Sequence, residues 1–269
     1  MRNYLLKIKK LVLSYWLYLV PHHLMSRLTY LITRTHHPLT QYLIKLYIKI
    51  FNVNIKECEN DNLASYQTFC DFFTRKLKKD VHVINNEVNS VVSSCDGRVL
   101  QFGSITNESI LQVKGKYTPL KELLCKDKEL TSLYNNGSFL TIYLSPKDYH
   151  RVHIPNTGKL MKTLHVPGRL FSVADHAVEC IKNLYSKNER LICNFKNQEL
   201  YFSVIFVGAI NVSSIETKWK GEISPPMPKK LISTKYGNKN ISFTKGDEIG
   251  MFKSGSTVIL LFTDKIKLS

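Results

Sequence analysis

The clearest hydrophobic pattern in the chain predicts β-strands. SFLTIYL at 138–144 alternates apolar and polar positions, as a strand with one buried face does. KLMKTLHV at 159–166 alternates in part, and YFSVIFVGAINV at 201–212 is apolar enough for a central strand. A last apolar segment follows Gly255 and predicts a strand close to the carboxyl end.

Helical patterns and one hairpin complete the expected core. SYQTFCDFFTRKL at 65–77 spaces its phenylalanines along one helical face, and shorter helices are expected around 118–125 and 174–185. VVSSC and RVLQFG flank Asp96-Gly97, and an Asp-Gly pair is typical of a tight hairpin turn. The predicted fold class is α+β, with a mainly antiparallel β core, a few helices and an amphipathic helical region at the amino terminus.

The amino-terminal region has a different pattern. Two or three short amphipathic helices are expected, roughly at 3–20, 23–34 and 38–52, because Pro21 and Pro38 interrupt the apolar segments. The longest apolar run has ten residues, whereas a bilayer span takes about twenty. No small-x-small cleavage site follows this run, so a secretory signal is not expected.

Basic charge is concentrated in the same region. Residues 1–56 contain nine Lys or Arg and no Asp or Glu, which is just over half of the chain's net charge of +17. Helices with basic faces opposed by aromatic and leucine side chains are typical of a membrane interface. We therefore expect 1–56 to be a membrane-association region and 57–269 the catalytic domain. The alternative is that these helices only cover the core, with their basic side chains in water.

Composition argues against several other classes. The 269 residues with 43% hydrophobic content allow a sizeable core, so a disordered chain is not expected. The six cysteines form no C-x-x-C pair and lack histidines at zinc-ligand spacing, which predicts reduced thiols and no metal site. Basic and aromatic residues form no concentrated stripe beyond residue 56, which argues against a nucleic-acid partner.

Three segments carry candidate chemistry. They are CDG at 95–97, KDYHRVHIP at 147–155 and KSGST at 253–257. Together they supply a carboxylate, two imidazoles and a hydroxyl, the groups of a relay in which the acid orients an imidazole that takes the hydroxyl proton. Each also has an ordinary structural interpretation, since Asp-Gly pairs are common in turns and Ser256 can be a strand-edge residue.

These segments resemble one known family. Seven segments of the chain resemble the characteristic segments of the phosphatidylserine decarboxylases. They are ASYQTFCDFFTRKLK (64–78), CDGRVLQFG (95–103), DYHRVHIP (148–155), VPGRLFSV (166–173), NERLIC (188–193), SSIETKWKGEI (213–223) and MFKSGSTVILLF (251–262). The likeness runs in order from about residue 5 to the carboxyl end. Two positions depart from the family pattern: Ser254 stands where leucine is common, and Ser213 where glycine is usual. Neither departure removes a chemical group, although Ser254 adds a second hydroxyl close to Ser256.

The resemblance implies a proenzyme that cuts itself between Gly255 and Ser256. The Ser256 hydroxyl can reach the preceding carbonyl through a five-membered ring, and Gly255 leaves the attacked carbon uncrowded. His153, oriented by Asp96, would be the base. Elimination from the resulting ester would leave dehydroalanine, which hydrolyses to a covalent pyruvoyl group on the fragment 256–269.

The reaction implied by the resemblance is decarboxylation of phosphatidylserine to phosphatidylethanolamine. The pyruvoyl group derived from Ser256 would form a Schiff base with the substrate amine and draw the electrons released with carbon dioxide. The family pattern assigns His150 to this step. The implied partners are the lipid, an anionic membrane surface on the cytoplasmic side, and the cleaved chains 1–255 (β) and 256–269 (α) as a heterodimer, which could pair further.

Two other interpretations stay open on the residues alone. One is a serine hydrolase that uses Asp96, His153 and Ser256 on an external ester at a membrane surface, although the chain has no G-x-S-x-G elbow. The other is a basic binding module in which the histidines and the serine are structural.

Overall fold

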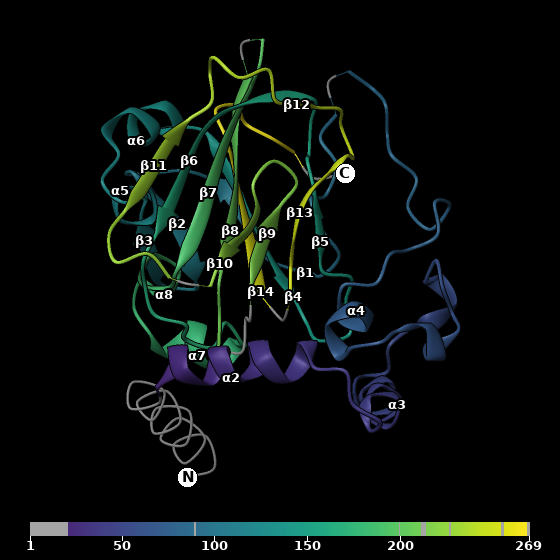
Figure 1. The fold of residues 1–269 in the computed structure, drawn as a ribbon. Coiled ribbons are helices and arrows are strands. Elements are labelled where there is room, and N and C mark those ends of the chain that lie inside the picture. Colours follow the sequence, from purple (N-terminus) through teal and green to yellow (C-terminus); the bar gives the residue numbers. More distant parts are fainter. Residues whose placement is uncertain are drawn as a thin grey trace.

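Two antiparallel sheets form the centre of the computed structural model, which describes residues 21–88, 90–198, 200–210, 214–225, 227–253 and 256–267 (Figure 1). In spatial order, the larger, eight-stranded sheet contains β1 (Arg98–Ser104), β4 (Ser138–Leu144), β14 (Ser256–Phe262), β8 (Leu200–Val207), β7 (Arg190–Asn197), β6 (Gly158–Val166) and β11 (Ile232–Lys235), with β12 (Ser242–Phe243) also paired to β6. The smaller, four-stranded sheet contains β10 (Gly221–Ser224), β9 (Ile215–Thr217), β13 (Glu248–Phe252) and β5 (Arg151–His153), and β2 (Ser109–Val113) pairs with β3 (Lys116–Pro119). The predicted α+β class with an antiparallel core is confirmed.

The last strand, β14, lies in the middle of the larger sheet, between β4 and β8. Ser256 pairs with Leu144 of β4, and Thr257 pairs with Tyr143 of β4 and Val207 of β8. Every residue of β14 is buried. Two hydrogen-bonded ladders therefore hold this strand independently of its covalent link to the preceding residues.

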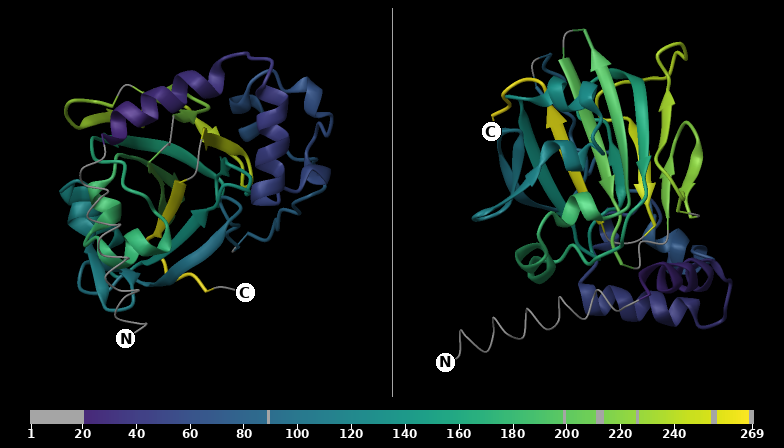
Figure 2. Two further views of the ribbon diagram at one scale, coloured as in Figure 1. Left: turned by 90° about the horizontal axis from the view of Figure 1, so that it is seen from below. Right: turned by 90° about the vertical axis from the view of Figure 1, so that its left-hand side faces the viewer.

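The first three described helices lie at one end of the sheets (Figures 1 and 2). They are α2 (His22–Arg34), α3 (Thr40–Phe51) and α4 (Phe69–Phe73), with single 3-10 turns η1 (Ile55–Glu57) and η2 (Leu63–Ser65) between them; α5 (Leu120–Leu123), α6 (Lys128–Tyr134), α7 (Asp175–Cys180) and α8 (Leu184–Lys187) are inserted between strands. α2 and α3 confirm two of the expected amino-terminal helices, and the one expected at 3–20 lies outside the described residues. Among the helices that are described, none is long and apolar enough to cross a membrane.

Local capping makes α4 shorter than the pattern at 65–77 predicts. The Thr68 hydroxyl accepts a hydrogen bond from the Asp71 backbone at 3.1 Å, and the Asp71 carboxylate accepts one from the Thr68 backbone at 3.0 Å. This reciprocal cap starts the helix after Thr68. The helix expected at 174–185 is likewise divided into α7 and α8, because Asn183 adopts a left-handed conformation with φ of 55°.

The hairpin expected around Asp96-Gly97 is wrong. The Val92 backbone donates instead to the Pro155 carbonyl at 2.9 Å, and the strand that follows Gly97 pairs with β4. Gly97 has φ of 147°, and a Cβ atom there would lie 2.3 Å from the Tyr143 carbonyl oxygen. Glycine is thus required by the close approach of a neighbouring backbone rather than by a two-residue turn.

Candidate active site

The chain passes from the smaller sheet to the larger one at the expected cleavage step. β13 ends at Phe252 and β14 begins at Ser256, while Ser254 and Gly255 lie outside the described residues. Ser256 is fully buried, and its Oγ has no hydrogen-bond partner within the part of the chain that is described. A buried hydroxyl without a partner costs about 1–3 kcal/mol, so the Ser256 hydroxyl adds no stability through a hydrogen bond to the described residues.

His150 lies beside this junction. Its carbonyl oxygen accepts a hydrogen bond from the Phe252 backbone at 3.0 Å, and its ring packs against Phe73 with centroids 4.2 Å apart. Nδ1–H donates to the Asp148 carbonyl oxygen at 2.7 Å, whereas Nε2 is buried and has no partner among the described residues. Burial lowers the pKa of His150 to about 3. The imidazole is therefore neutral, with its lone pair on Nε2.

His153, on β5, is engaged at both ring nitrogens. Nδ1–H donates to the Gly246 carbonyl at 2.7 Å, and the Tyr149 hydroxyl donates to Nε2 at 3.1 Å. Burial raises the pKa of Tyr149, which keeps its hydroxyl protonated as a donor. The His153 backbone also donates to the Ser94 carbonyl at 2.7 Å, so β5 lies alongside the segment that leads to Asp96.

Asp96 contacts His82, with 2.8 Å between Oδ1 and Nε2. Burial and the nearby Asp148 carboxylate raise the pKa of Asp96, against the opposing effect of His82. Asp96 and Tyr149 line the same polar cavity of about 180 Å³, together with Arg75. Tyr149 is thus the side chain that connects this cavity to His153.

The structure therefore brings the expected relay residues into neighbouring segments without joining them. No hydrogen bond links Asp96, His153 and Ser256 directly within the described ranges. Sequence reasoning missed His82 and Tyr149. His82 contacts the Asp96 carboxylate, and the Tyr149 hydroxyl contacts His153 Nε2. Tyr149 stands inside the DYHRVH motif, but nothing in that motif shows that its hydroxyl returns to the histidine four residues later.

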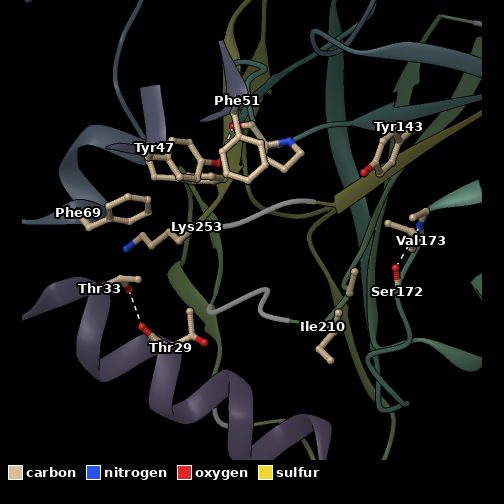
Figure 3. Close-up of a pocket in the computed structure, with 14 residues that line it drawn as sticks. Thr29, Thr33, Tyr47, Phe51, Phe69, Tyr143, Ser172, Val173, Ile210 and Lys253 are labelled. Atoms are coloured by element: carbon tan, nitrogen blue, oxygen red, sulfur yellow. Dashed lines mark hydrogen bonds between the residues drawn. The ribbon is translucent and has the colours of Figure 1, made fainter. Parts of the chain in front are cut away.

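A cavity of about 350 Å³ adjoins the junction (Figure 3). Its walls come from both the amino-terminal helices and the sheets: Thr29, Thr33, Tyr47, Phe51, Phe69, Phe73, Tyr143, Pro146, Ser172, Val173, Ala174, Ala209, Ile210 and Lys253. Phe73 connects it to His150, and Tyr143 connects it to Thr257 through the β-ladder. The lining is mostly apolar, with a few hydroxyl groups and one ammonium group among the side chains named.

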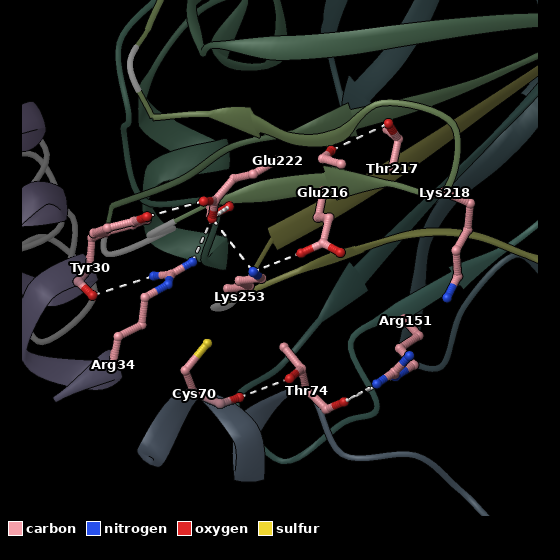
Figure 4. Close-up of polar contacts among 12 residues, drawn as sticks. Tyr30, Arg34, Cys70, Thr74, Arg151, Glu216, Thr217, Lys218, Glu222 and Lys253 are labelled. Atoms are coloured by element: carbon pink, nitrogen blue, oxygen red, sulfur yellow. Dashed lines mark hydrogen bonds and ion pairs between the residues drawn. The ribbon is translucent and has the colours of Figure 1, made fainter. Parts of the chain in front are cut away.

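A polar network ties that ammonium group to α2 (Figure 4). Lys253 Nζ lies 2.7 Å from a Glu216 oxygen and 3.5 Å from Glu222, and Glu222 also accepts from the Tyr30 hydroxyl at 3.0 Å. Burial acts to lower the pKa of Lys253, but the two carboxylates outweigh it and raise the pKa. The lysine is therefore held as a cation between the cavity and the smaller sheet.

Comparison with known proteins identifies the family. The family model described as phosphatidylserine decarboxylase matches residues 69–269, and a second model, described as PSD, matches residues 15–52. The chain belongs to the phosphatidylserine decarboxylase family. The resemblance carried by its motifs is thereby confirmed.

Individual relatives of this decarboxylase family agree. The phosphatidylserine decarboxylase proenzyme of Francisella tularensis subsp. novicida is 45% identical over 250 residues, which cover 92% of this chain and 87% of the relative. The proenzyme of the same name from Alkalilimnicola ehrlichii is 42% identical over 247 residues, covering 91% of this chain and 86% of the relative. The serine hydrolase interpretation finds no support in these relatives.

Proposed function

We propose that this chain decarboxylates phosphatidylserine to phosphatidylethanolamine, using a pyruvoyl group that it makes from Ser256 by self-cleavage after Gly255. The observation that carries the proposal is the buried, unpartnered Ser256 hydroxyl at the first position of a central strand. A cut before Ser256 leaves a new amino end that two ladders keep in place. Tyr143, which pairs with Thr257, also lines the cavity beside that end.

The surroundings of Ser256 fit a small covalent carbonyl group. A pyruvoyl group there would supply an electron sink for the amine of the substrate. The protein holds this group in place and shields it from water, since Ser256, Thr257 and His150 are all buried. In such surroundings polar groups interact more strongly than they do in water.

His150 is assigned to the proton transfer that accompanies decarboxylation. Its neutral imidazole keeps one hydrogen on Nδ1, committed to Asp148, and offers the Nε2 lone pair as an acceptor. Because burial holds the pKa of His150 so low, bulk protons do not occupy Nε2 near neutral pH. Nε2 can instead accept a proton from the ammonium group of the substrate, and it can return that proton to the α-carbon once carbon dioxide has left.

Maturation is assigned to the relay Asp96, His153 and Ser256. A neutral imidazole has one lone pair, so His153 Nε2 must exchange the Tyr149 hydroxyl for that of Ser256 before it can accept a proton. His153 Nδ1–H must likewise leave the Gly246 carbonyl before Asp96 can accept it, whereas the Asp96 carboxylate has further lone pairs and can keep its contact with His82. We infer that the segments carrying these residues shift slightly in the precursor before it cuts.

Residues 1–56 are assigned to the cytoplasmic face of the membrane, and 57–269 to catalysis. Several large apolar side chains on α2 and α3 are exposed: Leu24, Leu28, Leu31, Ile32, Leu39, Tyr42, Leu43, Leu46 and Ile50. Leu28 and Ile32 are one helical turn apart and 50% and 67% exposed. A contiguous apolar face beside basic residues suits the interface of an anionic leaflet. The same helices line the cavity, so the headgroup of a lipid can enter while its acyl chains stay in the bilayer.

Mass spectrometry and a lipid assay test the proposal together. The purified protein is expected to contain the fragment 256–269, blocked at its amino end by a ketone that borohydride reduces, and still bound to 1–255. Vesicles containing phosphatidylserine should release carbon dioxide in its presence. A wild-type chain that stays full-length with a free Ser256 hydroxyl contradicts the proposal.

A further inference from the structure

We propose that Arg75 is a positioning residue for the reaction proposed above: it holds the backbone of the turn at Lys147–Asp148, and this turn holds the His150 imidazole in a single tautomer. Arg75 follows α4 and is only 4% exposed. Its Nη2 donates to the Lys147 carbonyl at 2.8 Å and to the Asp148 carbonyl at 3.3 Å. A buried cation is thus placed against the backbone immediately before the histidine.

One carbonyl oxygen connects Arg75 to His150. The Asp148 oxygen that accepts from Arg75 also accepts from His150 Nδ1–H at 2.7 Å. A carbonyl oxygen has two lone pairs and can accept both hydrogen bonds. As long as this oxygen points at Nδ1, a neutral His150 carries its hydrogen there and its lone pair on Nε2.

The other polar groups of the turn are already occupied. The Ser145 backbone and hydroxyl both donate to one Asp148 carboxylate oxygen at 2.7 Å, and the Tyr47 hydroxyl donates to the Pro146 carbonyl at 2.7 Å. The Asp148 carboxylate therefore closes its own turn instead of contacting His150. The orientation of the Asp148 carbonyl is left to Arg75.

The position of Arg75 is itself fixed. Arg151 donates to the carbonyl of Thr74, the residue before Arg75, at 3.0 and 2.8 Å (Figure 4). Arg151 is held in turn by both oxygens of Glu248, at 3.0 and 2.9 Å. The Phe72 ring lies 5.4 Å from the guanidinium carbon of Arg75. These contacts hold the backbone that carries Arg75 and one side of its guanidinium, and Nη2 alone makes the hydrogen bonds to the turn, as a positioning role requires.

Arg75 also acts on the charge of His150. Burial lowers the pKa of His150, and the positive Arg75 lowers it further. Other titratable side chains surround this turn: Lys147, Asp148 and Tyr149 within or next to it, Glu57 and Asp96 across the polar cavity, Tyr47 from α3, Tyr143 from β4, and Lys253 after β13, the last paired with Glu216 and Glu222. Arg75 differs from them in sharing a hydrogen-bond acceptor with His150.

The tautomer can be measured without any decarboxylase activity. In the full chain carrying Ser256→Ala, with ¹⁵N-labelled histidine, we expect NMR to show His150 protonated at Nδ1 and unprotonated at Nε2 near neutral pH. Adding Arg75→Gln should populate the other tautomer and move protonation of His150 to higher pH by about one unit, because a nearby positive charge is lost. Arg98→Gln is the control, since Arg98 is exposed and pairs with Asp175. It should leave the His150 signals unchanged.

The mature enzyme gives a second reading. Arg75→Gln should lower kcat by about tenfold or more and move the acid limb of the kcat profile to higher pH. Arg75→Lys keeps the charge, so it should lower kcat while leaving that limb in place, and it serves if Arg75→Gln does not fold. If His150 is protonated at Nε2 in the Ser256→Ala chain, or if both Arg75 variants lose only thermal stability, the proposal is overturned. Failure of the decarboxylase function itself would instead appear as an inactive wild-type enzyme with an unchanged tautomer.

Discussion

Arg34 of α2 contacts Glu222 of β10 with 2.6 Å between Nη2 and Oε1 (Figure 4). Glu222 lies 3.5 Å from Lys253, the last described residue before the expected cleavage step. One carboxylate therefore joins a helix of the proposed membrane region to the segment that leads into Ser256. The attachment of α2 and the geometry of that segment share a contact that mutation can break.

Loss of this contact is expected to loosen α2. Arg34→Ala removes an ion pair that is partly exposed, so the local loss is about 1 kcal/mol or less. Amide hydrogen exchange across residues 22–34 should become faster by a few fold, and self-cleavage should slow slightly if the Lys253 segment is disturbed through Glu222. Arg98→Ala breaks the exposed pair with Asp175 and should leave α2 unchanged. Equal exchange rates in α2 for both variants would show that the ion pair does not anchor it.

The same contact is expected to weaken in acid. Burial acts to raise the pKa of Glu222, but the Ser214 hydrogen bond and the charges of Lys253 and Arg34 outweigh it, so the pKa is lowered. A carboxylate with a lowered pKa stabilises the fold above its unfolded value, about 4.3, and loses that contribution as pH falls through the folded value. Hydrogen exchange of α2 should therefore accelerate below about pH 4.3. A Glu222→Gln chain should lack this acid-dependent component.

Asp96 provides a test of the maturation relay. If it orients His153, Asp96→Asn should slow the appearance of the 1–255 chain by about a hundredfold or more, which is the usual scale of acid–base assistance. The ionised carboxylate is the active form, and burial raises the pKa of Asp96, so maturation should fail at a higher pH than for an ordinary aspartate. His82→Ala removes the interaction that lowers this pKa and should move the acid limb to still higher pH.

Asp80→Asn is the matched control, because Asp80 is an exposed carboxylate that precedes Asp96 in the chain. It should cut at the normal rate, as followed by gel electrophoresis of freshly refolded precursor. A normal rate for Asp96→Asn would remove Asp96 from the relay while leaving the decarboxylase function intact.

Much of the core could be predicted because its signals are local. Alternation at 138–144 and the apolar run at 201–212 each reflect one strand's own burial, and both became strands of the larger sheet. Gly97 misled because its requirement comes from the distant Tyr143 carbonyl, which no short motif reveals. The residue types of the site could also be predicted from short motifs. Their hydrogen-bond partners could not, because these depend on how segments far apart in the sequence pack together.

Ser256→Ala should abolish cleavage and activity without weakening the fold. The Ser256 hydroxyl is buried without a partner among the described residues, so its removal should leave the unfolding free energy equal to that of the uncut precursor or raise it by about 1 kcal/mol. Ser203→Ala, on the adjacent β8, is the matched control: its buried hydroxyl bonds Tyr134 at 2.8 Å. That variant should lose about 1 kcal/mol and still cut. A large loss of stability in Ser256→Ala would instead indicate a structural role for the hydroxyl.

The exposed apolar face gives the test of membrane association. Leu28 is 50% exposed on α2 and Ile50 is 63% exposed on α3. If both enter a leaflet, replacing either with glutamate removes roughly 1–2 kcal/mol of apolar burial and adds repulsion from anionic lipid. Cosedimentation with vesicles of mixed zwitterionic and anionic phospholipid should show binding weaker by about tenfold or more for each variant, which is the same energy expressed as an equilibrium constant.

Val83→Glu is the control for this surface, because Val83 is 93% exposed but lies outside both helices. Its vesicle binding should match the wild type within about twofold. All three variants should cut normally, since the three substituted positions are exposed whereas Ser256 is buried in the larger sheet. If Leu28→Glu and Ile50→Glu bound vesicles as well as Val83→Glu does, the apolar face would not be the surface that meets the membrane. The basic residues alone would then have to account for binding, which high salt would abolish.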